Sequence, residues 1–216
     1  GIGLEVRDEN IEALDLQFIS LSDAIKDAEY IGGLGDLGFM FVFIRKPSLL
    51  KKALERWEYL YLASGKTLRF PKEIGVMYEL TSNAIFAHEL AKILVDFQKR
   101  LKEEYGIDIT VYFSNGTNDM TQSVKGSRDE SRYVESIIYI PKNTEHKDYR
   151  EYKSYRVFYE GDQAVIDNIL HGIVVAHDMG VKVGLCGQAM INLLQIGTPE
   201  AIAAAKKIVA YLDSVG

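Results

Sequence analysis

The sequence predicts an α/β protein whose parallel sheet is arranged as a (β/α) barrel. Short runs rich in β-branched and aromatic residues alternate with longer stretches of helical period, which is the pattern of repeated strand-then-helix units. Polar side chains follow the ends of several of these runs. Because no Gly-x-Gly-x-x-Gly turn opens a helix after the first run, a barrel is favoured over a doubly wound dinucleotide-binding sheet.

Strands are predicted where a short apolar run is bounded by polar or glycine-rich residues. The six predicted strands are residues 2–6, 16–21, 39–44, 74–80, 110–114 and 182–186. The predicted helices between and after them are residues 47–57, 84–104, 163–179 and 199–215.

Side-chain spacing supports the first two helices. In the first, Leu50, Leu54 and Trp57 share one face, and Pro47 is early enough for a first turn. The second has apolar residues on or near one stripe, namely Ile85, Leu90, Ile93, Leu94 and Phe97. Residues 139–160 are charged and rich in tyrosine, so a long loop or excursion is predicted there, either solvated or acting as a lid.

Composition limits the class of partner. At 216 residues with 47% apolar and 26% charged residues, the chain fits one sizeable domain spanning residues 1–216. With a net charge of −6 and no Lys/Arg block, nucleic acid and anionic membranes are not expected partners, although a small anion needs only one or two arginines. The apolar runs are far shorter than the roughly 20 residues of a membrane span. The chain starts at Gly1 without a methionine, which indicates processing or a segment of a longer polypeptide.

Candidate site residues follow the predicted strands. They are Arg45, Glu79, Asn118, Asp119 and Cys186. In a parallel barrel, the C-terminal ends of the strands meet at one mouth, so these side chains can converge. Glu79 and Asp119 are hard oxygen ligands suited to Mg²⁺, and the planar fork of Arg45 suits a phosphate or carboxylate. Taken singly, each acid is more typical of a solvated or ion-paired group, and Arg45 fits a structural salt bridge equally well.

Cys186 is the only cysteine, which excludes an intrachain disulfide and favours a reducing cytoplasm. A lone cysteine is most often a small buried apolar residue. With glycines at 184 and 187, however, its thiol can face the barrel mouth and act as a general acid/base toward a substrate carbon. The four histidines show no metal-ligand spacing with it.

Motifs along most of the chain follow one pattern. They are Gly1-Ile2-Gly3-Leu4 with Arg7 and Glu9, Phe43-Ile44-Arg45, Glu79 with Ser82-Asn83-Ala84, residues 115–122 with Arg128-Asp129, and Ala176-His177 with residues 180–188. This set resembles the phosphoenolpyruvate synthase / pyruvate phosphate dikinase family of PEP-utilising enzymes, in its C-terminal phosphoenolpyruvate/pyruvate-binding barrel. The resemblance implies a TIM-type (β/α)8 barrel, of which this chain supplies six predicted strands.

The resemblance also implies an activity and a set of roles. The roles are Cys186 as the catalytic acid/base, Arg45, Arg7, Asn118, Thr117 and Gly116 as substrate-binding residues, and Glu79 and Asp119 as Mg²⁺ ligands. The implied reaction is that of a transferase or kinase, a phosphoryl transfer at the enolate oxygen of pyruvate. Its phosphohistidine and ATP-binding domains must come from the same or another polypeptide, and a homo-oligomer is expected. The alternatives are a ketoacid-binding or interaction subunit without catalysis, and a magnesium-dependent carbon–carbon lyase on a related barrel.

Overall fold

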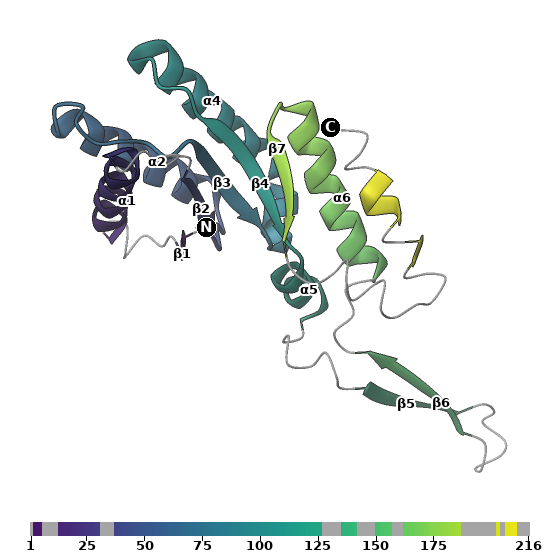
Figure 1. The fold of residues 1–216 in the computed structure, drawn as a ribbon. Coiled ribbons are helices and arrows are strands. Elements are labelled where there is room, and N and C mark those ends of the chain that lie inside the picture. Colours follow the sequence, from purple (N-terminus) through teal and green to yellow (C-terminus); the bar gives the residue numbers. More distant parts are fainter. Residues whose placement is uncertain are drawn as a thin grey trace.

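Five parallel strands form the central sheet in the computed structural model (Figure 1). They are β1 (Ile2–Glu5), β2 (Gly38–Val42), β3 (Glu73–Tyr78), β4 (Thr110–Gly116) and β7 (Lys182–Cys186), paired in the order β1-β2-β3-β4-β7. The structure describes residues 2–5, 13–30, 37–126, 135–141, 150–156, 162–186, 202–203 and 206–210, with the backbone alone for 2–5, 135–141 and 150–156. Because every one of these pairings is parallel, all C-terminal ends lie at the same edge.

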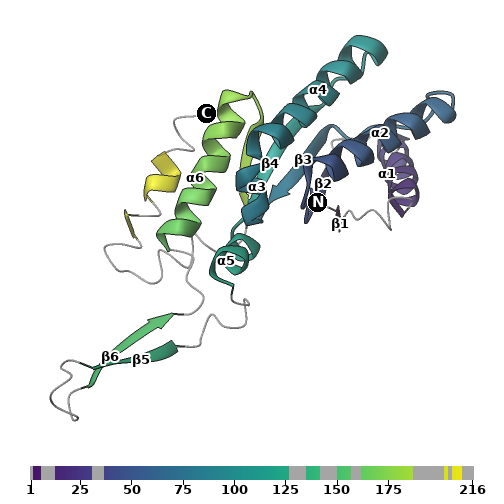
Figure 2. The ribbon, with the colours of Figure 1, turned by 180° about the vertical axis from the view of Figure 1, so that it is seen from behind.

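Helices connect these strands. Their bounds are α1 (Ala13–Tyr30), α2 (Pro47–Ala63), α3 (Thr81–Ile85), α4 (Ala87–Tyr105), α5 (Thr117–Lys125) and α6 (Gln163–Asp178). Contacts run from α1 to α2, from α2 to α4 and from α4 to α6, which is the pattern of one continuous helical layer. Two opposite views show α2, α4 and α6 together on one side of the sheet (Figures 1 and 2).

The core lies between that layer and one face of the sheet. Trp57 of α2 is fully buried, stacks on Phe18 of α1 at 4.7 Å between ring centroids, and meets Phe39 edge-on at 4.7 Å. Such aromatic packing removes a large apolar area from water in one cluster. A paired contact between Arg56 and Asp15, at 2.8 and 2.6 Å, joins α2 to α1 at the rim. The residues of β2, β3 and β4 that face the helices are mostly hydrophobic.

The predicted strand at residues 16–21 is wrong, because these residues belong to α1. The buried positions of this helix, Leu14, Phe18, Leu21 and Ile25, recur with the period of a helix. A six-residue window contained too little of this period to reveal it. The other five predicted strands are confirmed as β1, β2, β3, β4 and β7, with small shifts of their ends.

The predicted helices at residues 47–57 and 163–179 are confirmed as α2 and α6, whereas residues 84–104 fall in two helices, α3 and α4. Phe86 separates α3 from α4, and Ile85, predicted on the apolar stripe, is 77% exposed. Leu90, Leu94 and Phe97 are buried as predicted. For residues 199–215, positions 202–203 and 206–210 are helical, and the rest lie outside the described residues.

The segment 139–160, predicted as a long loop or excursion, contains parts of two strands. Strands β5 (Glu135–Pro141) and β6 (Arg150–Arg156) pair antiparallel as a separate two-stranded sheet. Residues 142–149 and 157–160 of this segment lie outside the described residues. Within the part of the chain that the structure describes, no helix is long and apolar enough to cross a bilayer.

Candidate active site

Glu79 follows β3 at the C-terminal edge of the sheet and is fully buried. The backbone N–H of Phe43, just past the end of β2, donates a hydrogen bond of 2.6 Å to its Oε1. A buried carboxylate is stable only where donors or cations surround it, so this contact fixes one oxygen of the group. The predicted position of Glu79 at a strand end is confirmed, whereas its role as a metal ligand stays a prediction.

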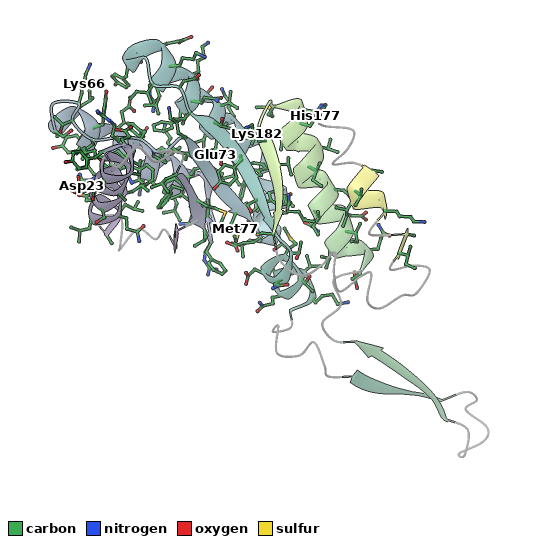
Figure 3. All side chains as sticks on the ribbon, in the orientation of Figure 1. Asp23, Lys66, Glu73, Met77, His177 and Lys182 are labelled. Carbon is green, nitrogen blue, oxygen red and sulfur yellow. The ribbon has the colours of Figure 1, made fainter. Side chains whose placement is uncertain are left out.

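Gly116 leaves room for the side chains of Glu79 and Met77. A Cβ placed on Gly116 would lie 2.9 Å from the Cβ of Glu79 and 3.1 Å from Met77, so any side chain here would push against these two residues. Met77 marks this end of β3 in Figure 3, and Glu73 marks the opposite end. The absence of a side chain at Gly116 therefore makes room for Glu79 and Met77.

Cys186 lies in the same row across the sheet. Cys186 ends β7 and pairs in register with Gly116 of β4. On the other side of β4, Asn115 pairs with Tyr78 of β3, and Glu79 is the next residue after Tyr78. Because side chains alternate along parallel strands, Glu79, Gly116 and Cys186 belong to the sheet face opposite the helices. Cys186 is partly exposed. A buried carboxylate and a partly exposed thiol thus share one row at the C-terminal edge.

The start of α5 adds three predicted residues to this edge. Thr117 is buried, and its Oγ1 donates to the carbonyl oxygen of Cys186 at 3.3 Å, which joins the ends of β4 and β7. Asn118 and Asp119 follow in the first turn and are partly buried. Oδ1 of Asp119 accepts a hydrogen bond of 3.2 Å from Gln122. Figure 1 shows α5 at the end of β4, at the C-terminal edge of the sheet.

The two arginines differ in what the structure says of them. Arg45 lies three residues after β2, exposed to solvent, at the same edge as Glu79. Arg7 lies outside the described residues. The edge therefore brings together Glu79, the start of α5 and Cys186, with Arg45 at the rim, which is the convergence that the strand-end argument predicts.

Two carboxylates at this edge fit a hard cation. Among the described side chains, no group of three or more His, Cys, Asp or Glu forms a complete metal cage. Magnesium does not need one, because it is commonly held by one or two carboxylates and completes its octahedron with water and substrate oxygens. Glu79 and Asp119 are of the right chemical type for such a site.

Asn83 is a residue that strand-end reasoning missed. It lies in α3, four residues after Glu79, and is 1% exposed. Its amide bonds to the backbone at the ends of both β2 and β3. Two signals in the sequence mark it: an amide shortly after a strand, which also occurs at ordinary helix starts, and its place in the motif of Glu79 with Ser82-Asn83-Ala84.

The described part of the chain is thus a parallel α/β sheet with a carboxylate, a thiol and an exposed arginine along its C-terminal edge, the edge at which parallel α/β sheets commonly bind ligands. The family model described as "PEP-utilising enzyme, PEP-binding domain" matches residues 9–197, so the chain belongs to this family of PEP-utilising enzymes. The predicted resemblance is confirmed.

Two curated relatives agree with this membership. The chain is 28% identical over 165 residues to the phosphoenolpyruvate synthase of Aeropyrum pernix, covering 76% of this chain and 16% of the relative. It is 26% identical over 203 residues to a protein named probable phosphoenolpyruvate synthase of Staphylothermus marinus, covering 88% of this chain and 20% of the relative. The chain thus spans at most a fifth of the length of these two relatives.

Proposed function

We propose that this chain binds pyruvate or phosphoenolpyruvate together with Mg²⁺ at the C-terminal edge of its sheet and supports phosphoryl transfer at the enolate oxygen. The observation that carries the proposal is the single row of Glu79, Gly116 and Cys186 across β3, β4 and β7, with Asp119 on the adjoining helix. Family membership supports the substrate class, because the matching family is described by its binding of PEP.

The role proposed for each residue is the one that the family resemblance implies. Glu79 and Asp119 would hold Mg²⁺, which when bound supplies positive charge opposite the enolate and carboxylate oxygens. Asn118, with Gly116 and Thr117, orients the three-carbon unit. Arg45 and Arg7 hold the carboxylate or the phosphoryl group.

The reaction then needs one proton transfer and one phosphoryl transfer. The Cys186 thiolate takes a proton from the methyl carbon of pyruvate, which leaves the enolate. The enolate oxygen forms a bond to phosphorus while the bond from phosphorus to a histidine nitrogen breaks. The phosphohistidine and ATP-binding domains that supply this group belong to the same or another polypeptide.

The proposal extends to the architecture. Residues 1–216 form one domain of the (β/α)8 barrel type, because strands paired in chain order beneath one helical layer are the arrangement of a barrel wall. A cytoplasmic homo-oligomer is the setting that we infer from the sequence.

Calorimetric binding of oxalate, a planar mimic of the pyruvate enolate, tests the site. The chain is expected to bind oxalate only with Mg²⁺, and Glu79→Gln and Asp119→Asn are each expected to weaken this binding at least about a hundredfold, because each removes a charged ligand. Glu73→Gln and Asp108→Asn make the same changes at the other end of β3 and before β4, and should bind as the wild type does. Equal loss in these controls, or no binding by the folded wild type, would contradict the proposal.

Exchange of pyruvate methyl protons with solvent deuterium tests the thiol. Cys186→Ala should lose Mg²⁺-dependent exchange at least about a hundredfold, in the range typical of general acid/base residues, while oxalate affinity changes little. Nuclear magnetic resonance of the pyruvate methyl group measures the rate. Exchange at the wild-type rate in this variant would remove Cys186 from the mechanism. Oxalate binding without any exchange by the wild type would instead favour a ketoacid-binding subunit.

A further inference from the structure

Asn83 links the ends of two neighbouring strands through one side chain. Its Nδ2 donates a hydrogen bond of 2.7 Å to the carbonyl oxygen of Ile44, beyond β2. Its Oδ1 accepts from the backbone N–H groups of Glu79 at 3.0 Å and Leu80 at 2.8 Å, beyond β3. The side chain is almost completely buried, so water competes little for these bonds.

The loop beyond β2 needs such support. Phe43 has a φ of 51°, a left-handed conformation that is costly for a residue with a large side chain and persists only where neighbouring contacts hold it. Its N–H is the group that donates to the Glu79 carboxylate. Ile44, which Asn83 holds, follows directly, and Arg45 comes next. One short loop therefore carries both a donor to Glu79 and the arginine at the rim.

We propose that Asn83 is a positioning residue of this site, which fixes the Glu79 carboxylate and the Arg45 loop relative to each other. The role rests on the proposed function, because Glu79 and Arg45 matter there as metal and anion ligands. Only an amide of this length supplies a donor for Ile44 and an acceptor for the two N–H groups at once. A residue that merely started α3 would need the acceptor but not the bond to Ile44.

Oxalate affinity in the presence of Mg²⁺ tests the positioning role. Asn83→Asp keeps the acceptor and loses the donor, whereas Asn83→Ala loses both without adding charge. Both are expected to bind oxalate about ten- to a hundredfold more weakly at a temperature where they are fully folded, because small misplacements at a site have effects of this size. Asn168→Asp is the matched control. Among the described residues, the Asn168 side chain donates its hydrogen bond within its own helix, to the Ala164 carbonyl oxygen at 2.7 Å. Wild-type affinity in both folded Asn83 variants would overturn the proposal.

Amide hydrogen exchange supplies a second readout that needs no ligand. In Asn83→Ala, the Phe43 amide is expected to exchange at least about tenfold faster, while the amide of Phe41 inside β2 keeps its protection. Equal loss at both positions would reduce Asn83 to a general stabilising residue, and no change at Phe43 would show that Asn83 does not hold this loop. Failure of the wild type to bind oxalate would count against the proposed function, and the Phe43 amide would still decide whether Asn83 holds the loop.

Discussion

Tyr112 lies across Gly75 on the sheet face that also carries Glu79 and Cys186. A Cβ placed on Gly75 would lie 2.5 Å from the Tyr112 ring, and the Tyr112 hydroxyl donates to the carbonyl oxygen of Phe39 at 3.3 Å. Burial raises the pKa of Tyr112 to about 12, and the charges of Glu73 and Cys186 add to the shift. Tyr112 therefore stays protonated, and a hydrogen-bond donor, at any physiological pH.

The contact between Gly75 and the Tyr112 ring predicts that alanine substitution changes stability differently at two glycines on the same face. Gly75→Ala should destabilise the chain by about 1–3 kcal/mol, because the new methyl group overlaps the ring of Tyr112. Gly184→Ala should change stability by less than about 1 kcal/mol, because the nearest atom to its Cβ would be the Phe113 carbonyl oxygen at 3.9 Å. Urea unfolding of the two variants measures both values. Equal effects would mean that the Tyr112 ring moves away freely.

Some residues of the candidate site could be predicted from the sequence and others could not. Glu79 and Cys186 were found because each directly follows or ends a strand, and strand ends of a parallel sheet share one edge. Asn83 and the left-handed Phe43 were missed as site features. Their importance comes from hydrogen bonds between segments 36 to 39 residues apart, and such bonds leave no periodic pattern in a sequence.

At the scale of elements, the start of α6 is tied to the end of α5. Asp162 caps α6 by accepting from the Ala164 N–H at 3.0 Å, and it forms a salt bridge with Lys125. The hydrogen bond from Lys125 lowers the pKa of Asp162, with the Ala164 N–H also contributing. A carboxyl with a lowered pKa in the folded state adds stability above its unfolded pKa, which is lost as the pH falls through the folded value.

Asp162→Ala should accordingly cost about 1–2 kcal/mol at pH 7, the usual range for an N-cap. The difference from the wild type should shrink as the pH falls below about 4, where the unfolded carboxyl becomes protonated. Urea unfolding at several pH values gives the curve. Asp167→Ala, an exposed position in the same helix, should change stability by less than about 0.5 kcal/mol at each pH. A cost for Asp162→Ala that does not vary with pH would assign the effect to the cap geometry alone.

Element type could be predicted for several of the long stretches that show one period, but not for α1. Helix α2 was predicted with its buried face, because Leu50, Leu54 and Trp57 are spaced for a helix and Pro47 suits its first turn. Residues 16–21 were misassigned because a short apolar run is compatible with either period. The break at Phe86 between α3 and α4 was also missed, since residues on both sides favour a helix and only the tertiary structure separates them.

At the scale of the whole molecule, the two faces of the sheet have different tasks. One face carries the large aromatic and aliphatic side chains that pack on the helical layer, among them Phe39, Val76 and Phe113. The other carries small and polar residues, including Gly75, Ser114 and Cys186, together with Tyr112 and Met77. Stability is thus concentrated on one face, and the candidate site occupies the edge of the other. The five strands lie side by side in their order along the chain. The alternation of strands and helices in the sequence predicts this parallel arrangement.

Because residues near the ends of β2, β3, β4 and β7 converge at this edge, ligand binding should stabilise the molecule as a whole. A ligand that binds only the folded state at 100 times its Kd adds about 2.7 kcal/mol. For a chain of this length, oxalate with Mg²⁺ should therefore raise Tm by roughly 5–10 °C. Calorimetric scans with oxalate alone, Mg²⁺ alone and both together separate the contributions, and Glu79→Gln should show no shift with both. A full shift with oxalate alone would place the anion at a site that does not use the two carboxylates. A rise in Tm that occurs only when oxalate and Mg²⁺ are both present would mean that metal and anion bind as one unit across the ends of the sheet.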